Sequence, residues 1–308
     1  MNRKNFSYVL FTAVAFAAME PASKLLSGQV DPLALTFLRF FIGSLVLLPM
    51  ALRTMKKQRL SLNRRDLLGL AARGILCVCV SMGLLQAAVF NAQSAAVIAV
   101  VFSTNSVMTA LFAAWLLQEK LTRRRIASLA LCMAGVAVGG AGAAAENVRA
   151  VALALLAAVA MSLFTVLGKR ELDRIPTCVQ IGLSFSIGTA LLGAALAVAG
   201  VPLTVRALDA RSLCILLFLG VVVTGLGYLS YFKAMEKAGA FMASLVFFIK
   251  PVLAPLMSLL ILGEARGGAA LYASIALVMA GSTLMLSERK EKQGEEVSGD
   301  LSGADDAL

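Results

Sequence analysis

The fold is decided by two long apolar stretches, AAVIAVVFSTNSVMTALFAAWLLQEK at residues 95–120 and AFMASLVFFIKPVLAPLMSLLILGE at residues 240–264. Each runs for more than twenty residues before its first acidic side chain, Glu119 or Glu264. That length lets an α-helix cross the roughly 30 Å hydrocarbon core of a bilayer. The two glutamates lie 145 residues apart, and the residues before them match at the same shift. The stretches therefore predict a membrane protein with an internal duplication.

The composition extends this prediction to the whole chain. Of the 308 residues, 60% are hydrophobic and 15% are charged, whereas globular proteins are about 45–50% apolar and about 25% charged. Sheets with open edges leave backbone groups unsatisfied in lipid, and barrel strands are shorter than the runs seen here. We predict an all-α membrane protein with ten transmembrane helices, near residues 6–26, 33–53, 67–89, 94–117, 124–143, 150–169, 176–199, 211–232, 239–262 and 267–286.

Lys and Arg side chains are distributed unevenly between the two sides of such a bundle. If the amino terminus is cytoplasmic, 20 of them fall in cytoplasmic segments and five on the opposite side. The positive-inside rule therefore places both termini in the cytoplasm. Because loop cations of this kind make up the net charge of +11, we expect no nucleic-acid partner. The polar residues 288–308 are expected to form a disordered cytoplasmic tail.

The duplication covers both halves of the chain. The shift of 145 residues aligns Lys24 with Lys169, Phe40 with Phe185 and Gly43 with Gly188. We expect one five-helix repeat at residues 1–145 and a second at 146–287. Because five is an odd number, the second repeat enters the membrane from the opposite side, so the repeats are inverted. Inverted repeats are a recurrent architecture of secondary transporters, with a substrate site near the membrane midplane.

The same stretches carry a family resemblance. Residues 95–120, followed by Leu121-Thr122 and a later Ala134-Gly135 pair, and their counterparts before Ala280-Gly281 resemble the EamA family of the drug/metabolite transporter superfamily. The Arg39-Phe40 step also fits this family. The resemblance implies ten helices and transport of amino acids, sugars, nucleotide-type metabolites or drugs, often outward. The chain departs from the pattern at Lys250, where many members have an acidic or neutral residue.

These observations predict a secondary-active, alternating-access transporter of the bacterial inner membrane. We expect it to export small polar, zwitterionic or anionic metabolites such as amino acids; a lipid flippase or multidrug exporter of the same fold is the alternative. Transport coupled to protons or ions is one option for its energy source. We expect a monomer, with a dimer as the alternative. An enzyme is not expected, because the chain has no histidine. No cofactor and no metal is expected either.

Charged residues inside the spans are the first candidates for the substrate site, because a charge at the centre of a membrane helix costs about 2.5–3.5 kcal/mol on insertion scales. There are four: Glu20, Arg39, Arg73 and Lys250. At about 1.5 Å per residue, the first two and Lys250 share a level near the midplane. We expect Lys250 and Arg39 to hold a carboxylate or phosphate and Glu20 an amine or a proton. The alternative is that Glu20 pairs with either cation to tie helices together, and that Arg73 extends to the headgroups.

Polar and aromatic residues of the same region complete the predicted site. Asn105 aligns with Lys250 across the duplication. We expect it to contact substrate together with Gln86, Tyr228, Tyr231, Phe102 and Phe247. Prolines in the ninth span, Pro251 and Pro255, are expected to interrupt the helix there. We assign them, with Glu119 and Glu264 at the ends of the two stretches, to structure or gating.

Overall fold

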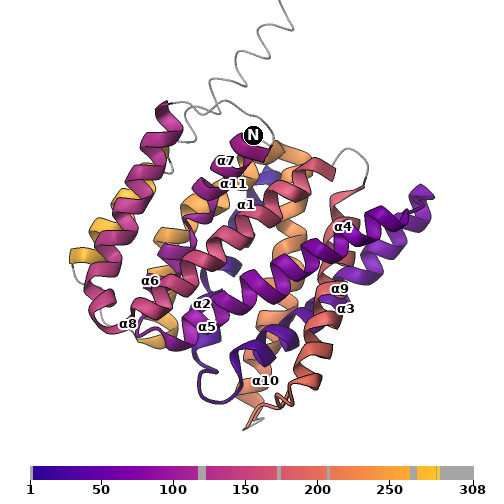
Figure 1. Cartoon of the computed structure of the whole chain (residues 1–308), viewed down its shortest axis with the longest axis horizontal. Coiled ribbons are helices and arrows are strands. Elements are labelled where there is room, and N and C mark those ends of the chain that lie inside the picture. The colour runs from indigo at the N-terminus through magenta and orange to yellow at the C-terminus, as the bar shows by residue number, and fades with distance from the viewer. Residues whose placement is uncertain are drawn as a thin grey trace, which may run out of the picture.

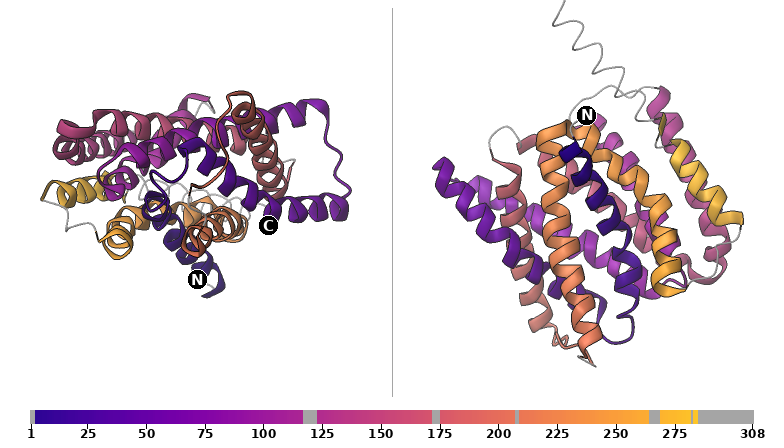
Figure 2. Two further views of the ribbon diagram at one scale, coloured as in Figure 1. Left: turned by 90° about the horizontal axis from the view of Figure 1, so that it is seen from below. Right: turned by 180° about the vertical axis from the view of Figure 1, so that it is seen from behind.

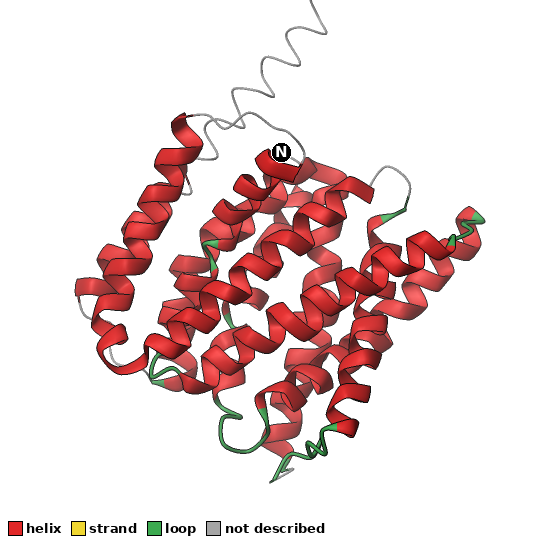
Figure 3. Cartoon of the chain, in the orientation of Figure 1, coloured by secondary structure: helices red, strands yellow, loops and turns green. Residues whose placement is uncertain are grey.

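The protein is a bundle of helices. The computed structural model describes residues 3–116, 123–171, 175–206, 209–263, 269–281 and 283–284. These residues form helices and short loops, and no strand occurs among them (Figure 3). Within the described ranges, six helices are long and apolar enough to cross a membrane, and three shorter apolar helices accompany them. The predicted all-α membrane fold is confirmed.

Each of the ten predicted spans corresponds to a helical segment (Figure 1). The first four spans contain α1 (Arg3–Ala17), α2 (Met19–Lys24), α3 (Pro32–Gln58), α4 (Arg64–Gly74), the π-helix η1 (Ile75–Met82), α5 (Gly83–Asn91), α6 (Ala95–Phe102) and α7 (Asn105–Leu116). The others contain α8 (Arg123–Glu171), α9 (Thr177–Val198), α10 (Ala210–Leu217), the π-helix η2 (Phe218–Gly227), α11 (Tyr228–Leu262) and a last helix, Ala269–Gly281.

The expected interruption of the ninth span was wrong. Backbone geometry stays helical through Pro251 and Pro255, so α11 continues to Leu262. Each proline removes one hydrogen-bond donor, but the surrounding turns keep the helix intact. The loops expected between spans five and six and between spans eight and nine are also helical, apart from Asn147 of α8, whose φ is −148° and ψ is 49°.

The break near the middle of the membrane lies in the fourth span instead, between α6 and α7. Ser103 Oγ donates a hydrogen bond to the carbonyl of Ala99 at 2.7 Å, and Thr104 Oγ1 donates to that of Val101 at 2.7 Å. Such bonds compete with the helical pattern and bend helices. The break places Asn105 at the start of α7.

Packing follows the duplication. The second span of each repeat packs on the other, as α3 on α9, and the first span of each packs on the fourth of the other, as α1 on α11 and α8 on α6 and α7. Figure 2 shows α1 lying beside α11. At the centre, the duplicated residues Phe40 and Phe185 meet edge to face, with ring centroids 5.0 Å apart. The contact pattern is the one expected of two repeats exchanged by an approximate two-fold axis.

The third and eighth spans repeat an unusual feature. Each contains a π-helix, η1 or η2, and a shift of 145 residues superimposes most of one on the other. Beside them the duplicated glycines pack closely: a Cβ on Gly43 would lie 2.7 Å from Thr224 of η2, and one on Gly188 would overlap the backbone of Gly74. At Gly43 a side chain would have to shift to admit a Cβ, whereas at Gly188 the clash is with backbone and requires glycine.

The loops predicted to lie outside the cell share one end of the bundle. The backbone N–H of Arg206 donates to the carbonyl of Gln29 at 2.8 Å, and the hydroxyl of Ser212 donates to the amide oxygen of Gln29 at 3.0 Å. Lys24 reaches the carbonyls of Val89, at 3.0 Å, and Ala92 in the next outer loop. Three predicted outer loops are thus joined.

Candidate functional site

A buried ion pair joins the first and ninth spans. Lys250 Nζ in α11 lies 2.6 Å from Glu20 Oε1 in α2, and the side chains are 2% and 0% exposed. α1 ends at Ala17 and α2 begins at Met19, so Glu20 lies in the first turn of α2. The second carboxylate oxygen, Glu20 Oε2, has no hydrogen-bond partner. Of the two pairings that the sequence allows, the described residues form this one.

Arg39 lies in the same region, and no carboxylate of the described residues forms a salt bridge with it. It is 2% exposed, its Nη2 donates to the sulfur of Met82 at 3.1 Å, and its guanidinium lies 5.0 Å from the ring centroid of Phe40. Its Nε has no hydrogen-bond partner. Glu20 lies within the range of electrostatic interaction with Arg39. A thioether is a weak acceptor, so the guanidinium keeps hydrogen-bonding capacity for a stronger one.

Two buried amides accompany these charges. Gln86 lies one helical turn after Met82 and is 2% exposed, and its Nε2 has no hydrogen-bond partner. Asn105 is 3% exposed, with an unpartnered Oδ1, while its backbone carbonyl accepts from Ser162 Oγ at 2.8 Å. Buried polar atoms of native proteins are normally hydrogen-bonded, so these atoms are candidates for contact with a ligand.

Aromatic rings lie close to the charges. Lys250 Nζ is 5.0 Å from the ring centroid of Phe102. The ring of Tyr228 packs on Phe185 at 4.8 Å, on Phe16 at 5.0 Å and on Phe40 at 6.5 Å. We call these four rings, Tyr228, Phe185, Phe16 and Phe40, the aromatic cluster. The ring of Tyr231 lies 6.3 Å from that of Phe16.

Arg73 is buried rather than directed to the headgroups. It is 5% exposed, its Nη1 donates to Gln180 Oε1 at 2.7 Å, and its guanidinium lies 5.1 Å from the ring centroid of Phe164. The extension to the headgroups that the sequence allowed is therefore wrong. Gln180, which sequence reasoning missed, had one signal, an amide within the apolar run of the seventh span. Met82 had no such signal.

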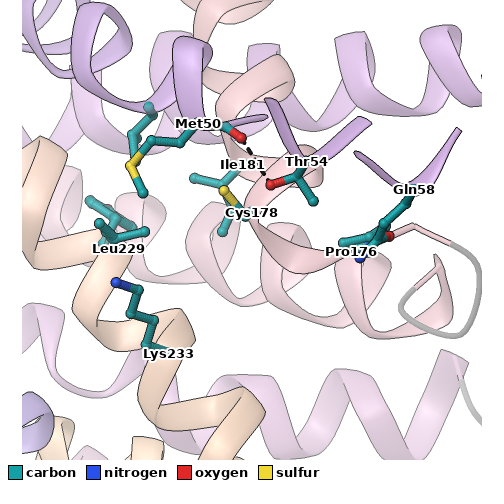
Figure 4. A pocket seen from close by; sticks show the side chains of 10 residues that line it. Met50, Thr54, Gln58, Pro176, Cys178, Ile181, Leu229 and Lys233 are labelled. Atoms are coloured by element: carbon teal, nitrogen blue, oxygen red, sulfur yellow. Dashed lines mark hydrogen bonds between the residues drawn. The ribbon is translucent and has the colours of Figure 1, made fainter. Parts of the chain in front are cut away.

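A pocket of about 260 Å³ lies between the end of α3 and the starts of α9 and α11 (Figure 4). Its walls include Leu47, Met50, Ile181 and Leu229, and Tyr228 of the aromatic cluster also lines it. Polar groups come from Thr54, Gln58, Cys178 and Lys233. These helix ends lie on the side that the charge distribution assigns to the cytoplasm, and we call this cavity the inner pocket. Sequence reasoning did not predict it.

Some predicted residues cannot be placed. Glu119 and Glu264 lie outside the described residues, and the side chain of Phe247 does as well. Pro251 and Pro255 lie within α11, next in the chain to Lys250 and to Ala254, which packs with Ala17 and Ala99. Among the residues that the structure describes, no three His, Cys, Asp or Glu side chains gather as a metal site would require.

Known proteins resemble this chain along most of its length. The model of the EamA-like transporter family matches twice, at residues 4–139 and 148–287. A protein of Clostridium kluyveri described as an uncharacterized transporter is 35% identical over 272 residues, which make up 85% of this chain and 86% of that protein. A protein of Archaeoglobus fulgidus with the same description is 24% identical over 258 residues, 83% of this chain and 88% of that one.

A solved crystal structure shares the fold. It has a TM-score of 0.64 and 24% sequence identity, and the match covers 92% of this chain and 97% of the other. The two family-model matches together span most of the 308 residues and fall one in each half. The chain is therefore a multi-pass membrane transporter and belongs to the EamA-like transporter family of the drug/metabolite transporter superfamily.

Proposed function

We propose that this protein is a secondary-active, alternating-access exporter of small zwitterionic or anionic metabolites, such as amino acids, in the bacterial inner membrane. The observation that carries the proposal is Arg39, a buried guanidinium whose hydrogen bond, among the described residues, goes to a thioether rather than to a carboxylate. A buried charge is costly unless it is paired. A substrate carboxylate would supply the missing partner.

The ion pair next to Arg39 gives the site its second feature. Lys250 holds one oxygen of Glu20 at 2.6 Å and leaves Glu20 Oε2 without a partner. A substrate ammonium group bound there, with its carboxylate on Arg39, satisfies both buried groups at once. Glu20, Lys250 and Arg39 sum to one positive charge, so a zwitterion or an anion fits the site better than a cation. Gln86 and Asn105 supply further polar contacts from the third and fourth spans.

The test is counterflow into proteoliposomes that contain the purified protein. We expect saturable exchange of a labelled amino acid, and Arg39→Met should lower its uptake at least tenfold, equivalent to about 1.4 kcal/mol of lost binding. Arg211→Met, at an exposed outer position, is the matched control and should transport normally. If the protein scrambles fluorescent phospholipids but exchanges no soluble metabolite, it is a flippase and the proposal is wrong.

A further inference from the structure

The inner pocket and the buried charges are separated by the aromatic cluster. Tyr228 lines the pocket, is 5% exposed, and packs on Phe185 and Phe40 at 4.8 and 6.5 Å. Arg39 lies over the ring of Phe40, 5.0 Å from its centroid. A molecule that moves from the pocket toward Arg39 must therefore displace the ring of Tyr228 or its neighbours.

The lining of the inner pocket has a definite chemistry. Lys233 lines the cavity beside Leu229, and its ammonium group also lies 5.9 Å from the ring centroid of Tyr8 in α1 (Figure 4). None of the described lining residues is acidic, and the walls are mainly apolar. The volume of about 260 Å³ falls just below the roughly 300–1,000 Å³ typical of ligand pockets. These properties fit a small carboxylate whose side chain is apolar.

The corresponding outer position is filled. By the shift of 145 residues, Tyr228 corresponds to Gly83 and Cys178 to Leu33. A Cβ added to Gly83 would lie only 2.9 Å from Leu33 Cδ2, so the outer helices are in tight contact where the inner ones leave a cavity. The two repeats thus differ at these equivalent positions: among the described residues, Leu33 packs on Gly83 on the outer side, whereas Tyr228 and Cys178 line a cavity on the inner side.

We propose that the inner pocket is the first binding site for cargo, that it selects a carboxylate with an apolar side chain, and that Tyr228 is the gate to Arg39. Lys233 binds the carboxylate, and Leu47, Met50 and Ile181 surround the side chain. This inference rests on the proposed function and narrows its substrate class to apolar amino acids. Binding at Lys233 precedes transfer of the carboxylate to Arg39.

Cys178 provides a probe of the pocket, because it is partly exposed there. In a Cys214→Ser variant, which removes the exposed thiol, a maleimide should alkylate Cys178, as located by peptide mass spectrometry. Leucine at ten times its dissociation constant should slow this reaction about tenfold, because only about one site in eleven stays empty. Glycine, which lacks the apolar side chain, should protect much less. Cys178→Ser in the same background is the labelling control.

The outcomes separate this inference from the proposed function. Leucine counterflow that depends on Arg39, without protection of Cys178, overturns the pocket as an entry site and leaves the transport proposal standing. Protection of Cys178 by leucine without any counterflow supports the pocket as a binding site and overturns the transport proposal. Protection by phosphatidylglycerol added to detergent-purified protein, but not by leucine, identifies a lipid site and overturns the inference.

The gate is tested at Cys77, a fully buried thiol within the range of electrostatic interaction with both Tyr228 and Arg39. In a Cys178→Ser/Cys214→Ser background, Tyr228→Ala should raise the alkylation rate of Cys77 at least tenfold, whereas Tyr228→Phe, which keeps the ring, should leave it unchanged. A correctly folded Tyr228→Ala protein, judged by gel filtration, in which Cys77 stays unreactive contradicts the gate.

Discussion

Four charged side chains are buried among the described residues, and the groups that each one contacts indicate its role. Lys250 and Glu20 neutralise each other across two spans, whereas Arg73 donates to the neutral amide of Gln180 and Arg39 to a sulfur. Breaking a buried pair is more costly than never having it, because the remaining charge stays buried alone. The Glu20–Lys250 pair should therefore affect both the stability of the folded protein and transport, and substitutions can separate these two effects.

A double-mutant cycle at this pair makes the separation. Glu20→Gln or Lys250→Met alone should destabilise the protein by about 3–5 kcal/mol, because each leaves one buried charge unpaired. The double variant should recover much of that loss, since no charge remains. Thermal unfolding in detergent measures the stabilities, and counterflow measures transport, which we expect to be lost in all three variants.

Transport by the double variant would contradict the role of the pair in substrate binding and leave it a structural tie. Strictly additive losses of stability would show instead that the two side chains do not interact in the folded protein, since contacting pairs usually couple by about 0.5–3 kcal/mol.

At this scale the sequence predicts where charges lie but not their neighbours. Depth along the helices brought Glu20 and Lys250 to one level, because each helix advances by a fixed rise per residue. Counting residues along a helix gives the depth of a side chain but not the direction in which it points around the helix axis. The hydrogen bonds of Arg39 with Met82 and of Arg73 with Gln180 were therefore not predicted.

At the scale of elements, close helix packing depends on the duplicated glycines. A Cβ on Gly188 would overlap the carbonyl of Gly74, so Gly188→Ala should force α9 and α4 apart and destabilise the protein by about 1–3 kcal/mol. Gly225→Ala is the matched control, because its new Cβ would lie 3.3 Å from Val46 and needs only a small shift. Equal melting temperatures for the two variants would show that the α4–α9 contact tolerates a side chain.

The start of α10 carries a pH-sensitive cap. Asp209 Oδ1 accepts a hydrogen bond from the backbone N–H of Ser212 at 2.8 Å, and the interactions with Ser212 hold the pKa of Asp209 below its usual value. The cap should be fully formed above the ordinary Asp pKa of about 3.9 and lost as the pH falls through the lower folded value. Hydrogen exchange at the first turn of α10 should therefore lose protection in acid.

Asp209→Asn is the control for that effect, since asparagine caps helices about as well as aspartate without titrating near this pH. Its protection should stay constant over the same range. If both proteins lose protection together, acid acts on α10 by another route than the cap.

The elements themselves were largely predictable, and their irregularities were not. Long apolar runs give helices wherever lipid leaves the backbone no other partner. The break between α6 and α7 arises from side-chain hydrogen bonds of Ser103 and Thr104, whereas Pro251 and Pro255, the stronger signals for a break, lie in a continuous helix. The π-helices η1 and η2 follow no residue pattern that we recognised.

At the scale of the whole molecule, the two repeats make equivalent contacts but differ between the inner and the outer side. The sequence predicts two equivalent repeats, and the contacts of α3 with α9 and of α1 with α11 follow that expectation. A sequence repeat describes both halves alike, so it cannot reveal that the inner pocket is open while Leu33 packs against Gly83 on the outer side. That difference belongs to one conformation. Alternating access requires a second conformation in which the two sides exchange roles.

Distances across both ends of the bundle test this exchange. Spin labels at Gln58→Cys and Lys233→Cys report the inner pocket, and labels at Asn91→Cys and Ala199→Cys report the outer ends of the corresponding spans, each pair in a Cys178→Ser/Cys214→Ser background. We expect two populations for each pair, and the fraction with a short inner distance should equal the fraction with a long outer distance. If the inner and outer distances of the ligand-free protein instead shorten and lengthen together, the whole bundle expands and contracts. The inner and outer sides would then not open in turn, which contradicts alternating access. Equal and opposite fractions would instead follow from a rigid rotation of one repeat against the other, with the α3–α9 contact at Phe40 and Phe185 as its pivot.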